Sequence, residues 1–543
     1  MAKSNGLIDQ YGNPLRARRN AQPTARYLRD TRSGIIASRM VPLTESRDDI
    51  RSSWSRAAAL ALDLIKNSGR LRGAADQVIA DTVGSGLKLM PTPDFTGLDW
   101  SDEEIKEWKK LVKKRWHQYR ANAKEVDFRG KFNLSKLVEI ALRYDMAYGE
   151  VTALLEYMPG PLRRRYGIET GTKLCMVPPH RLVQDTNEFD NLFQGVRQDE
   201  NGRPIGYLFE ERQNGLTTKK MYAAQDSTGR DTVLHIFNPM CATDMRGISV
   251  LASAFRKHIQ HEMLDDATLQ TAILQTIFAA TLTSEKPTME AFEALESLKD
   301  NDVKNASDYA DEYVTYLKES LSAAADDTLR IGGDPQVSHL APGEELDLKS
   351  TGTPGPHYQP FSSGLSRDTA RAIGITYGAL TMDHSSANYS SVRMENSSIW
   401  PVVERRRSNT AAPIERAVYQ SWLDESIFMG RLPFKGGYGA FLTHRPAVSG
   451  ATFQGPPQPT ADDGKSAKAS TERIQNGTSS VDIEAANLGI DPDELFEQIR
   501  EGHEKYVAAG MISPYDRNPG GSNDNDDDED EDEDEKKPQR ANA

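Results

Sequence analysis

The sequence predicts a mainly helical α+β protein made of several subdomains. One run, from Ile248 to Glu285, contains neither Gly nor Pro and repeats apolar residues at helical spacing. Shorter amphipathic stretches lie on both sides of it, and short strand-like segments gather between Glu150 and Phe237. Because a chain of 543 residues is too long for one ordinary hydrophobic core, these elements must be divided among more than one subdomain.

The N-terminal part begins with a basic, irregular arm, residues 1–45, and continues with helices. Within the first forty residues, eight Lys and Arg stand against two Asp. Ser101 and Glu104 match a capping box, in which each side chain meets the backbone near the other residue. The helix that follows has a Lys-rich face, from Ile105 to Tyr119, which we interpret as a solvated side. The expected helices are Asp48–Lys66, Gly73–Val83, the stretch after Ser101, and Leu134–Tyr148.

A small, mostly antiparallel β region is expected next, because the helical period gives way to short apolar segments separated by Gly, Pro, Asn and Asp. An isolated strand precedes it after the turn Gly84-Ser85-Gly86. The expected strands are Leu87–Met90, Gly149–Leu155, Lys173–Val177, Ile205–Glu210 and Thr232–Phe237.

The long helix expected over Ile248–Glu285 would extend over about 50 Å at about 1.5 Å per residue. A helix of this length usually packs against others in a bundle or an oligomer. Four polar residues along it raise the question of a metal site: His258, His261, Glu262 and Asp265. Their HxxHE spacing matches neither of the zinc motifs HExxH and HxxEH. We therefore expect no metal, no cofactor and no catalytic residue in this helix.

Beyond Pro287, the segment Thr288–Ala325 is charged and helical in pattern. Val337–Leu340 and Glu345–Leu348 then flank a Pro-Gly pair that suits a type II turn, which predicts a β-hairpin. A Gly/Pro-rich linker, Thr351–Pro360, follows.

The stretch around which the chain is organised runs from Arg367 to Arg407. Its first part, Arg367–Leu380, has a helical pattern, and Thr381–Ser391 is a polar break with the composition of a loop. From Val392 the helical pattern resumes. By its residues alone, the loop could be a ligand site, a hinge or a projecting finger.

The helical pattern from Val392 continues to about Met429, and Pro401 and Pro413 should kink or break it. Pro446–Gly464 is expected to be a linker. Asp524–Glu535 holds eleven acidic residues, and a tail of like charges is expected to be disordered. The helices expected between the linker and the tail are Ala467–Gln475, Ser480–Leu488 and Pro492–Val507.

Composition narrows the class of protein. The net charge of −14 and a hydrophobic content of 37% fit a soluble protein with exposed loops. The two cysteines, Cys175 and Cys241, are expected to be buried thiols in a reducing cytoplasm. No run approaches the roughly 18 apolar residues of a membrane helix, so no membrane partner is expected.

Several stretches resemble the lambda-type family of bacteriophage portal proteins, and the resemblance extends from about residue 20 to residue 510. The most distinctive is NYSSVR, Asn388–Arg393, after the helical segment Leu365–Ala379. Three others contribute: Thr232–Val250, Ser470–Gly489, and the turn at Gly84 to Leu87.

The resemblance implies a portal fold assembled as a homo-oligomeric ring of about twelve subunits. It divides the chain into a wing (46–247), a first stem helix (248–286), a clip (287–357), a second stem helix (358–380), a tunnel loop (381–391), a kinked wing helix with linker (392–464), a crown (465–512) and a tail (513–543). The implied clip contacts are Val337, His339, Glu345 and Asp347. The implied channel residues are Asp383, His384, Ser385, Asn388 and Tyr389.

The same resemblance implies the function. The ring would occupy one capsid vertex, nucleate capsid assembly, pass double-stranded DNA during packaging and ejection, and dock other proteins. The implied partners are the terminase large subunit, head–tail adaptor proteins, the major capsid protein and a scaffold protein. The expected location is the virion, with assembly in the host cytoplasm. No enzymatic activity is implied, since ATP hydrolysis would belong to the motor and no Walker motif occurs.

Two alternatives stay open at this point. The first is a metal-dependent enzyme that uses His258, His261 and Glu262. The second is a general nucleic-acid-binding protein that uses the basic arm and the Lys-rich helix Ile105–Tyr119.

Overall fold

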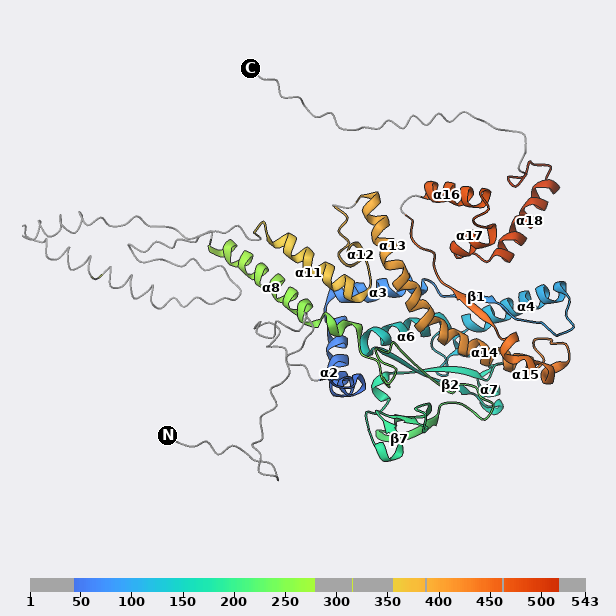
Figure 1. Cartoon of the computed structure of the whole chain (residues 1–543), viewed down its shortest axis with the longest axis horizontal. Coiled ribbons are helices and arrows are strands. Elements are labelled where there is room, and N and C mark those ends of the chain that lie inside the picture. The colour runs from blue at the N-terminus through green and yellow to red at the C-terminus, as the bar shows by residue number, and fades with distance from the viewer. Residues whose placement is uncertain (1–42, 279–314, 316–354, 386–387, 461–462, 517–543) are drawn as a thin grey trace, which may run out of the picture.

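The computed structural model describes residues 43–278, 315, 355–385, 388–460 and 463–516, and confirms a mainly helical α+β fold (Figure 1). The longer helices are α2 (Ser46–Asn67), α3 (Gly69–Val83), α4 (Asp102–Ala121), α6 (Leu134–Tyr148), α8 (Phe255–Phe278), α11 (Tyr358–Ile373), α13 (Tyr389–Arg406), α14 (Ala412–Phe428), α15 (Gly437–Val448), α16 (Asp463–Gln475) and α18 (Pro492–Ala508). The shorter ones include α5 (Ala123–Val126), α7 (Gly160–Tyr166), α12 (Tyr377–Thr381) and α17 (Val481–Asn487).

The strands of the described residues form three small sheets, and every pairing within them is antiparallel. One sheet has the order β3-β2-β8 (Thr172–Val177, Glu150–Tyr157, Val233–Phe237). The second has the order β4-β5-β6-β7 (Leu192–Phe193, Val196–Gln198, Pro204–Gln213, Leu216–Ala223), and the third pairs β1 (Lys88–Pro91) with β9 (Ala451–Gln454). The predicted antiparallel β region is therefore confirmed.

The main hydrophobic core lies where α14 meets α4. Trp116 of α4 packs against Tyr419 and Trp422 of α14, with ring centroids 5.4 and 5.3 Å apart. Both T-shaped pairs are buried, so they contribute apolar area together with a favourable ring geometry. A second core joins α3 and α6 to α11 and α12 through residues such as Val78, Met146, Ile373 and Leu380.

The helices α8 and α11 run side by side and project from one end of the body, while α16, α17 and α18 lie at another end (Figure 1). The predicted capping box at Ser101 is confirmed: Ser101 Oγ accepts from Glu104 N at 3.3 Å, and Glu104 Oε2 accepts from Ser101 N at 2.8 Å. Helix α6 has the predicted bounds, and α2, α3 and α4 lie where helices were expected.

A buried ion pair fixes the segment that leads into α8. Arg246 Nε donates to both carboxylate oxygens of Glu150, at 2.9 and 2.8 Å, and both side chains are fully buried. The Arg246 guanidinium also lies 4.5 Å from the ring centroid of Trp54. Burial acts to raise the pKa of Glu150, but Arg246 and a hydrogen bond with His235 outweigh it and lower that pKa to about 2. Glu150 therefore stays ionised and paired.

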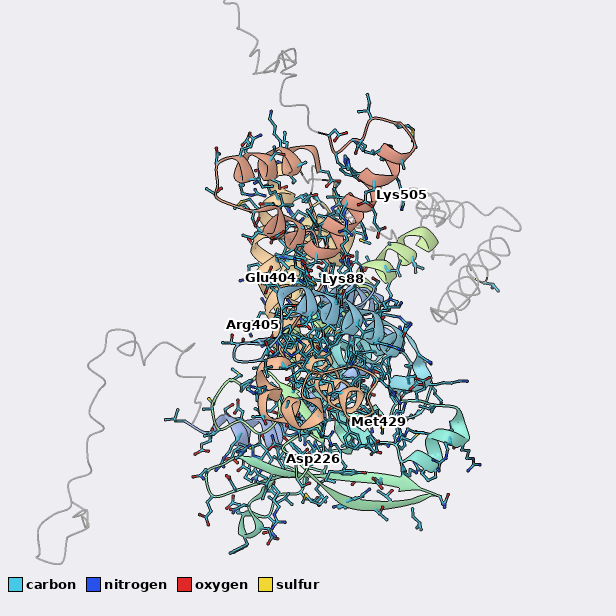
Figure 2. The ribbon with its side chains drawn as sticks, turned by 90° about the vertical axis from the view of Figure 1, so that its right-hand side faces the viewer. Lys88, Asp226, Glu404, Arg405, Met429 and Lys505 are labelled. Carbon is cyan, nitrogen blue, oxygen red and sulfur yellow. The ribbon has the colours of Figure 1, made fainter. Side chains whose placement is uncertain are left out.

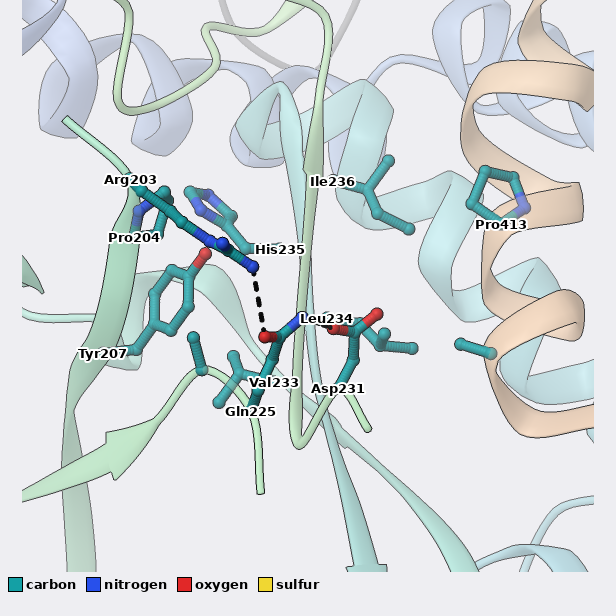
Figure 3. Close-up of a pocket in the computed structure, with 12 residues that line it drawn as sticks. Arg203, Pro204, Tyr207, Gln225, Asp231, Val233, Leu234, His235, Ile236 and Pro413 are labelled. Carbon is teal, nitrogen blue, oxygen red and sulfur yellow. Dashed lines mark hydrogen bonds between the residues drawn. The ribbon is translucent and has the colours of Figure 1, made fainter. Parts of the chain in front are cut away.

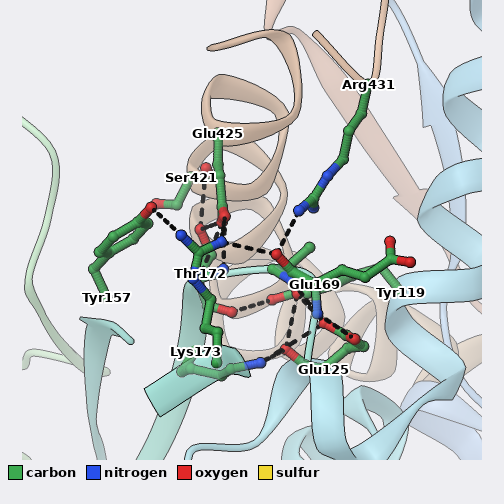
Figure 4. Close-up of polar contacts among 12 residues, drawn as sticks. Tyr119, Glu125, Tyr157, Glu169, Thr172, Lys173, Ser421, Glu425 and Arg431 are labelled. Carbon is green, nitrogen blue, oxygen red and sulfur yellow. Dashed lines mark hydrogen bonds and ion pairs between the residues drawn. The ribbon is translucent and has the colours of Figure 1, made fainter. Parts of the chain in front are cut away.

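A second polar network fastens the connection between α7 and β3 to α14 (Figure 4). Glu425 accepts hydrogen bonds from Gly171 N at 2.6 Å and from Thr172 N and Oγ1 at 2.8 Å each. Nearby, Glu125 accepts from Glu169 N at 3.0 Å. The two carboxylates thus satisfy backbone N–H groups of the connection and of the first residue of β3.

The long helix begins later than predicted. A short 3₁₀ helix, Val250–Ser253, comes first, and α8 starts at Phe255. The reason is Ser249, whose hydroxyl accepts from Leu251 N at 3.2 Å and donates to the Met146 carbonyl at 2.6 Å. These bonds hold the start of the segment against α6 in a non-helical conformation. The part of the predicted helix after Phe278 lies outside the described residues.

The prediction of one continuous helix that ends at Leu380 is wrong. Gly374 adopts φ 81°, a left-handed conformation that favours glycine, and it terminates α11. Thr376 then starts the short helix α12, because its hydroxyl accepts from Ala379 N at 3.1 Å. The chain therefore turns before the polar loop.

The two prolines behave differently from each other. Pro401 is accommodated inside α13, whereas Pro413 stands in the first turn of α14 after a π-helical segment, Arg407–Ala411. Since proline has no N–H to donate, the wider π turn accommodates the missing hydrogen bond. The regular α-helical pattern is therefore interrupted before the second proline and not at the first.

Two other predictions need correction. The linker expected over Pro446–Gly464 instead includes the end of α15 and the strand β9, which pairs with β1 far away in sequence. Cys241 is exposed rather than buried, and Cys175 is partly buried; both are free thiols. Across the described ranges, no helix is both long enough and apolar enough to span a membrane.

Candidate functional site

The candidate site is the polar loop between α12 and α13, residues 382–388, of which 386–387 fall outside the described residues. In Figure 1, α12 and the first turn of α13 lie together at the edge of the body, beside the projecting pair α8 and α11. The loop is therefore a connection on the surface between two helices.

The first half of the loop is ordered by its own side chains. Met382 adopts φ 55° and its side chain is exposed. Asp383 N donates to Thr381 Oγ1 at 3.3 Å, and Asp383 Oδ1 accepts from Ser385 N at 3.0 Å and Ser385 Oγ at 2.6 Å. These bonds from Ser385 lower the pKa of Asp383, so the loop keeps one negative charge.

The second half of the loop ends in a helix cap. Asn388 Oδ1 accepts from Ser391 N at 2.8 Å, and Ser391 Oγ accepts from Asn388 N at 3.0 Å. Two backbone donors at the start of α13 are satisfied in this way. The cap fixes where the loop stops.

The structure places the predicted loop residues as follows. His384, Ser385 and Asn388 are exposed, and Asp383 is partly exposed. Tyr389 is the first residue of α13 rather than a loop residue, because the Asn388 cap starts the helix there. The predicted hairpin residues Val337, His339, Glu345 and Asp347 lie outside the described residues.

Two arginines at the end of α13 tie it to α11 and α3, a role that the sequence pattern alone did not reveal. Arg406 Nη2 donates to the carbonyl of Ile373, the last residue of α11, at 2.8 Å. Arg407 Nε donates to the carbonyl of Thr82, near the end of α3, at 2.9 Å. Cations at helix C-termini satisfy carbonyls that have no partner within the helix. The signal in sequence was the run of three arginines at the end of a long helix.

A polar cluster holds the projecting helices to α3. Arg70 donates to His261 Nδ1 at 2.8 Å and forms an ion pair with Asp265 at 3.3 Å. Since arginine is only a donor, His261 Nδ1 is the acceptor, and its Nε2 carries the proton toward Ser362 Oγ at 2.7 Å. Tyr358 Oη donates to Asp265 Oδ1 at 2.6 Å. The cluster thus links α3, α8 and α11.

The hydrogen bonds of His261 and His258 also concern the alternative of a metal-dependent enzyme. The lone pair of His261 Nδ1 is used by Arg70, and His258 Nε2 lies 3.2 Å from Ser68 Oγ. Within the part of the chain that the structure describes, no group of three or more His, Cys, Asp or Glu side chains is arranged to hold a metal ion. Burial lowers the pKa of both histidines.

A hollow of about 330 Å³ lies between β6, β8 and the start of α14 (Figure 3). Three of its polar side chains bind one another: Arg203 donates to Gln225 at 3.3 Å, and Gln225 donates to Asp231 at 2.9 Å. These groups are engaged with each other rather than presented to a ligand.

The family comparison decides the class of protein. Residues 32–407, more than half of the chain, match the family described as "Phage portal protein, lambda family". The chain belongs to this family. The earlier resemblance to lambda-type portal proteins is thereby confirmed.

Two portal proteins show how similar the whole chain is to other members. The chain is 26% identical over 487 residues to the "Portal protein" of Escherichia phage N15, covering 87% of this chain and 88% of that protein. It is also 26% identical over 485 residues to "Portal protein B" of Escherichia phage lambda, with the same coverage.

Among solved structures, the chain is similar to chains from two neck assemblies of GTA particles. One is described as the neck of an empty particle with C6 symmetry (TM-score 0.35, 13% identity, 83% of this chain and 94% of the other). The other is described as the neck of a native particle with C12 symmetry (TM-score 0.36, 12% identity, 80% and 94%).

Membership of the portal family accords with the expectation that the chain is a structural protein rather than an enzyme. The second alternative is a general nucleic-acid-binding protein that uses the Lys-rich helix. Two lysines of that helix pair with carboxylates of the same chain. Lys110 of α4 pairs with Glu497 at 2.7 Å, and Lys113 pairs with the nearly buried Asp491. These lysines bind the protein's own C-terminal helix.

Proposed function

We propose that this portal-family chain forms a ring at one capsid vertex and that the ring is the channel for double-stranded DNA during packaging and ejection. In this proposal it nucleates capsid assembly and docks the terminase large subunit, the head–tail adaptor proteins, the major capsid protein and a scaffold protein. It is a virion component that assembles in the host cytoplasm. The support is family membership together with the loop between α12 and α13.

The parts of the chain are proposed to serve the channel as follows. The projecting helices α8 and α11 are the two stem helices, and residues 287–357 between them are the clip. The body from 46 to 247 is the wing, α13 and α14 are its kinked helix, and α16 to α18 are the crown.

The observation that carries the proposal is the construction of the loop. Both of its ends are fixed, by Thr381 at one side and by the Asn388 cap at the other, while the side chains of His384, Ser385 and Asn388 are exposed. A ring repeats such a loop around its axis, so a short loop becomes a circular constriction.

The loop chemistry suits DNA that must slide. Phosphate contacts carry no sequence information, and each cation that neutralises a phosphate strengthens binding by releasing a counterion. Among the described loop residues the charged side chain is Asp383, which is anionic, and His384 is the polar neighbour. A channel lining of this kind repels the DNA phosphate backbone weakly and does not bind it tightly.

The experiment is DNA packaging by phage that carry loop variants. One variant deletes Asp383–Asn388, and a matched variant replaces the same residues with Gly and Ser at unchanged length. We expect both to form rings, the deletion to lose packaging or DNA retention, and the replacement to lose less, since space-filling matters more than specific contacts. Loss of ring formation in the deletion would make the loop an assembly interface instead, and normal packaging by the deletion would refute its role in the channel.

A further inference from the structure

Arg406 has one buried donor that binds nothing in the part of the chain that the structure describes. Its Nη2 donates to the carbonyl of Ile373 at 2.8 Å, whereas its Nη1 is buried and has no hydrogen-bond partner. The guanidinium lies close against the end of α11, because a Cβ at Gly374 would lie 3.5 Å from Nη2. A buried donor without an acceptor is unfavourable, so Nη1 would gain from any acceptor within its reach.

Asp145, in the last turn of α6, is a buried carboxylate near this donor. Its side chain is 4% exposed, and among the described residues it forms neither a side-chain hydrogen bond nor an ion pair. Burial raises the pKa of Asp145 to about 6, and the charge of Arg406 acts against this rise. The two groups are therefore close enough to interact electrostatically without being in contact.

Three other charged side chains lie around this pair, and each is accounted for. Asp81 of α3 accepts a hydrogen bond at 2.8 Å from a glutamine one turn earlier in its helix. Arg407 of the π-helical segment donates to backbone carbonyls at the end of α3. Arg405 is exposed at the edge of the body (Figure 2). Asp145 is thus the buried carboxylate near Arg406 that lacks a hydrogen-bonded partner.

We propose that Arg406 and Asp145 form a pH-sensitive bridge that joins α6 and α13 to α11 when Asp145 is ionised. In the closed bridge, Nη1 donates to the Asp145 carboxylate while Nη2 keeps its bond to the Ile373 carbonyl, since a guanidinium presents several donors in a fixed fork. Protonation of Asp145 removes the negative charge and opens the bridge. Asp145 is a positioning residue that acts on α11 through Arg406. The bridge is a property of the single chain and goes beyond the proposed channel.

The bridge responds to pH in a defined direction. Contact with Arg406 lowers the pKa of Asp145, so the closed form binds fewer protons than the open form, and rising pH favours closure around pH 6. Burial of Asp145 has the opposite effect on global unfolding. Because the folded-state pKa is raised from 3.8 to about 6, that contribution to stability is lost as the pH rises through this window. A local measurement at α11 distinguishes the two effects.

Hydrogen exchange of the full-length chain at pH 5 and pH 7.5 tests the bridge, with gel filtration to confirm the same assembly state at both values. After correction for intrinsic exchange rates, we expect the last turn of α11 to be protected at least about threefold more at pH 7.5. Asp145→Asn keeps the shape of the side chain but cannot ionise, so its protection should be equal at the two pH values. The same difference in Asp145→Asn as in the wild type, or no difference in the wild type, overturns the inference.

Two further variants separate Asp145 from the groups around it. Arg406→Met removes the donor and should give the same flat pH profile, with no further change when it is combined with Asp145→Asn. Asp81→Asn removes the other carboxylate whose charge acts on Arg406 and should retain the wild-type profile. Additive effects in the double variant would show that Arg406 and Asp145 act separately. A flat profile in Asp81→Asn would assign the pH dependence to Asp81, and either result overturns the bridge.

Discussion

Arg406 of α13 donates a hydrogen bond to the carbonyl of Ile373, the last residue of α11, at 2.8 Å. This contact joins the last residue of α13, the helix that follows the loop, to the end of α11, the helix before α12. The carbonyl belongs to a helix end that Gly374 terminates, so the arginine satisfies an acceptor that the helix cannot. The contact therefore ties the end of α13 to the end of α11.

Replacing Arg406 with methionine should loosen the contact between α13 and α11. The Ile373 carbonyl would lose its donor, and a buried acceptor without a partner costs about 1–3 kcal/mol. We expect a fall of that size in the free energy of unfolding, with faster hydrogen exchange in α12. The control is Arg405→Met on the exposed neighbour, for which a change within about 0.5 kcal/mol is expected. Equal effects of the two substitutions would contradict the role given to Arg406.

The buried pair Glu150–Arg246 should dominate stability in the body. Glu150→Gln leaves Arg246 buried without its counter-charge, and removal of one partner of a buried pair costs about 3–5 kcal/mol. Urea unfolding of this variant, with Glu501→Gln on exposed α18 as control, measures the loss. A fall of less than about 1 kcal/mol in the free energy of unfolding would contradict a dominant role of this ion pair in stability.

The same pair predicts an acid dependence. The folded-state pKa of Glu150 is lowered from 4.5 to about 2, so the folded protein binds fewer protons than the unfolded chain between these values. The stabilising contribution is present above pH 4.5 and is lost as the pH falls toward 2. Between pH 5 and pH 3, the free energy of unfolding should fall less for Glu150→Gln than for the wild type. An identical fall in both proteins would rule out this carboxylate as the cause of the acid dependence.

The Arg70–His261 contact predicts a second dependence, at higher pH. Burial, and then Arg70, lower the pKa of His261 from 6.5, so the unfolded chain binds more protons as the pH falls below 6.5. The contact's stabilisation is thus present above pH 6.5 and declines below it. His261→Gln should flatten stability between pH 7.5 and 5.5, measured by thermal unfolding. His503→Gln, at a partly exposed histidine of α18, should retain the wild-type slope of stability against pH. A steep slope in both variants would show that another group causes the pH dependence.

Helices with local signals could be predicted from the sequence. Ser101 and Glu104 form the capping box that their spacing indicated, and α6 ends at the predicted Tyr148 before a left-handed Gly149. These features depend on interactions within a few residues, so the sequence pattern was sufficient.

Elements that depend on distant partners could not be predicted. Strand β9 exists because it pairs with β1, with Lys88 opposite Gln454. The break at Gly374 was hidden because the apolar spacing continues through it. At the loop, the Asn388 cap was readable in principle from Asn388 and Ser391, whereas the reach of Arg406 to Ile373 required the tertiary structure.

The most direct measurement of the central claim is negative-stain imaging of the purified full-length chain, with mass determination of the same particles. We expect closed rings of about twelve copies with a central opening. A monomer or dimer at every protein concentration would contradict the account, whatever the loop variants do.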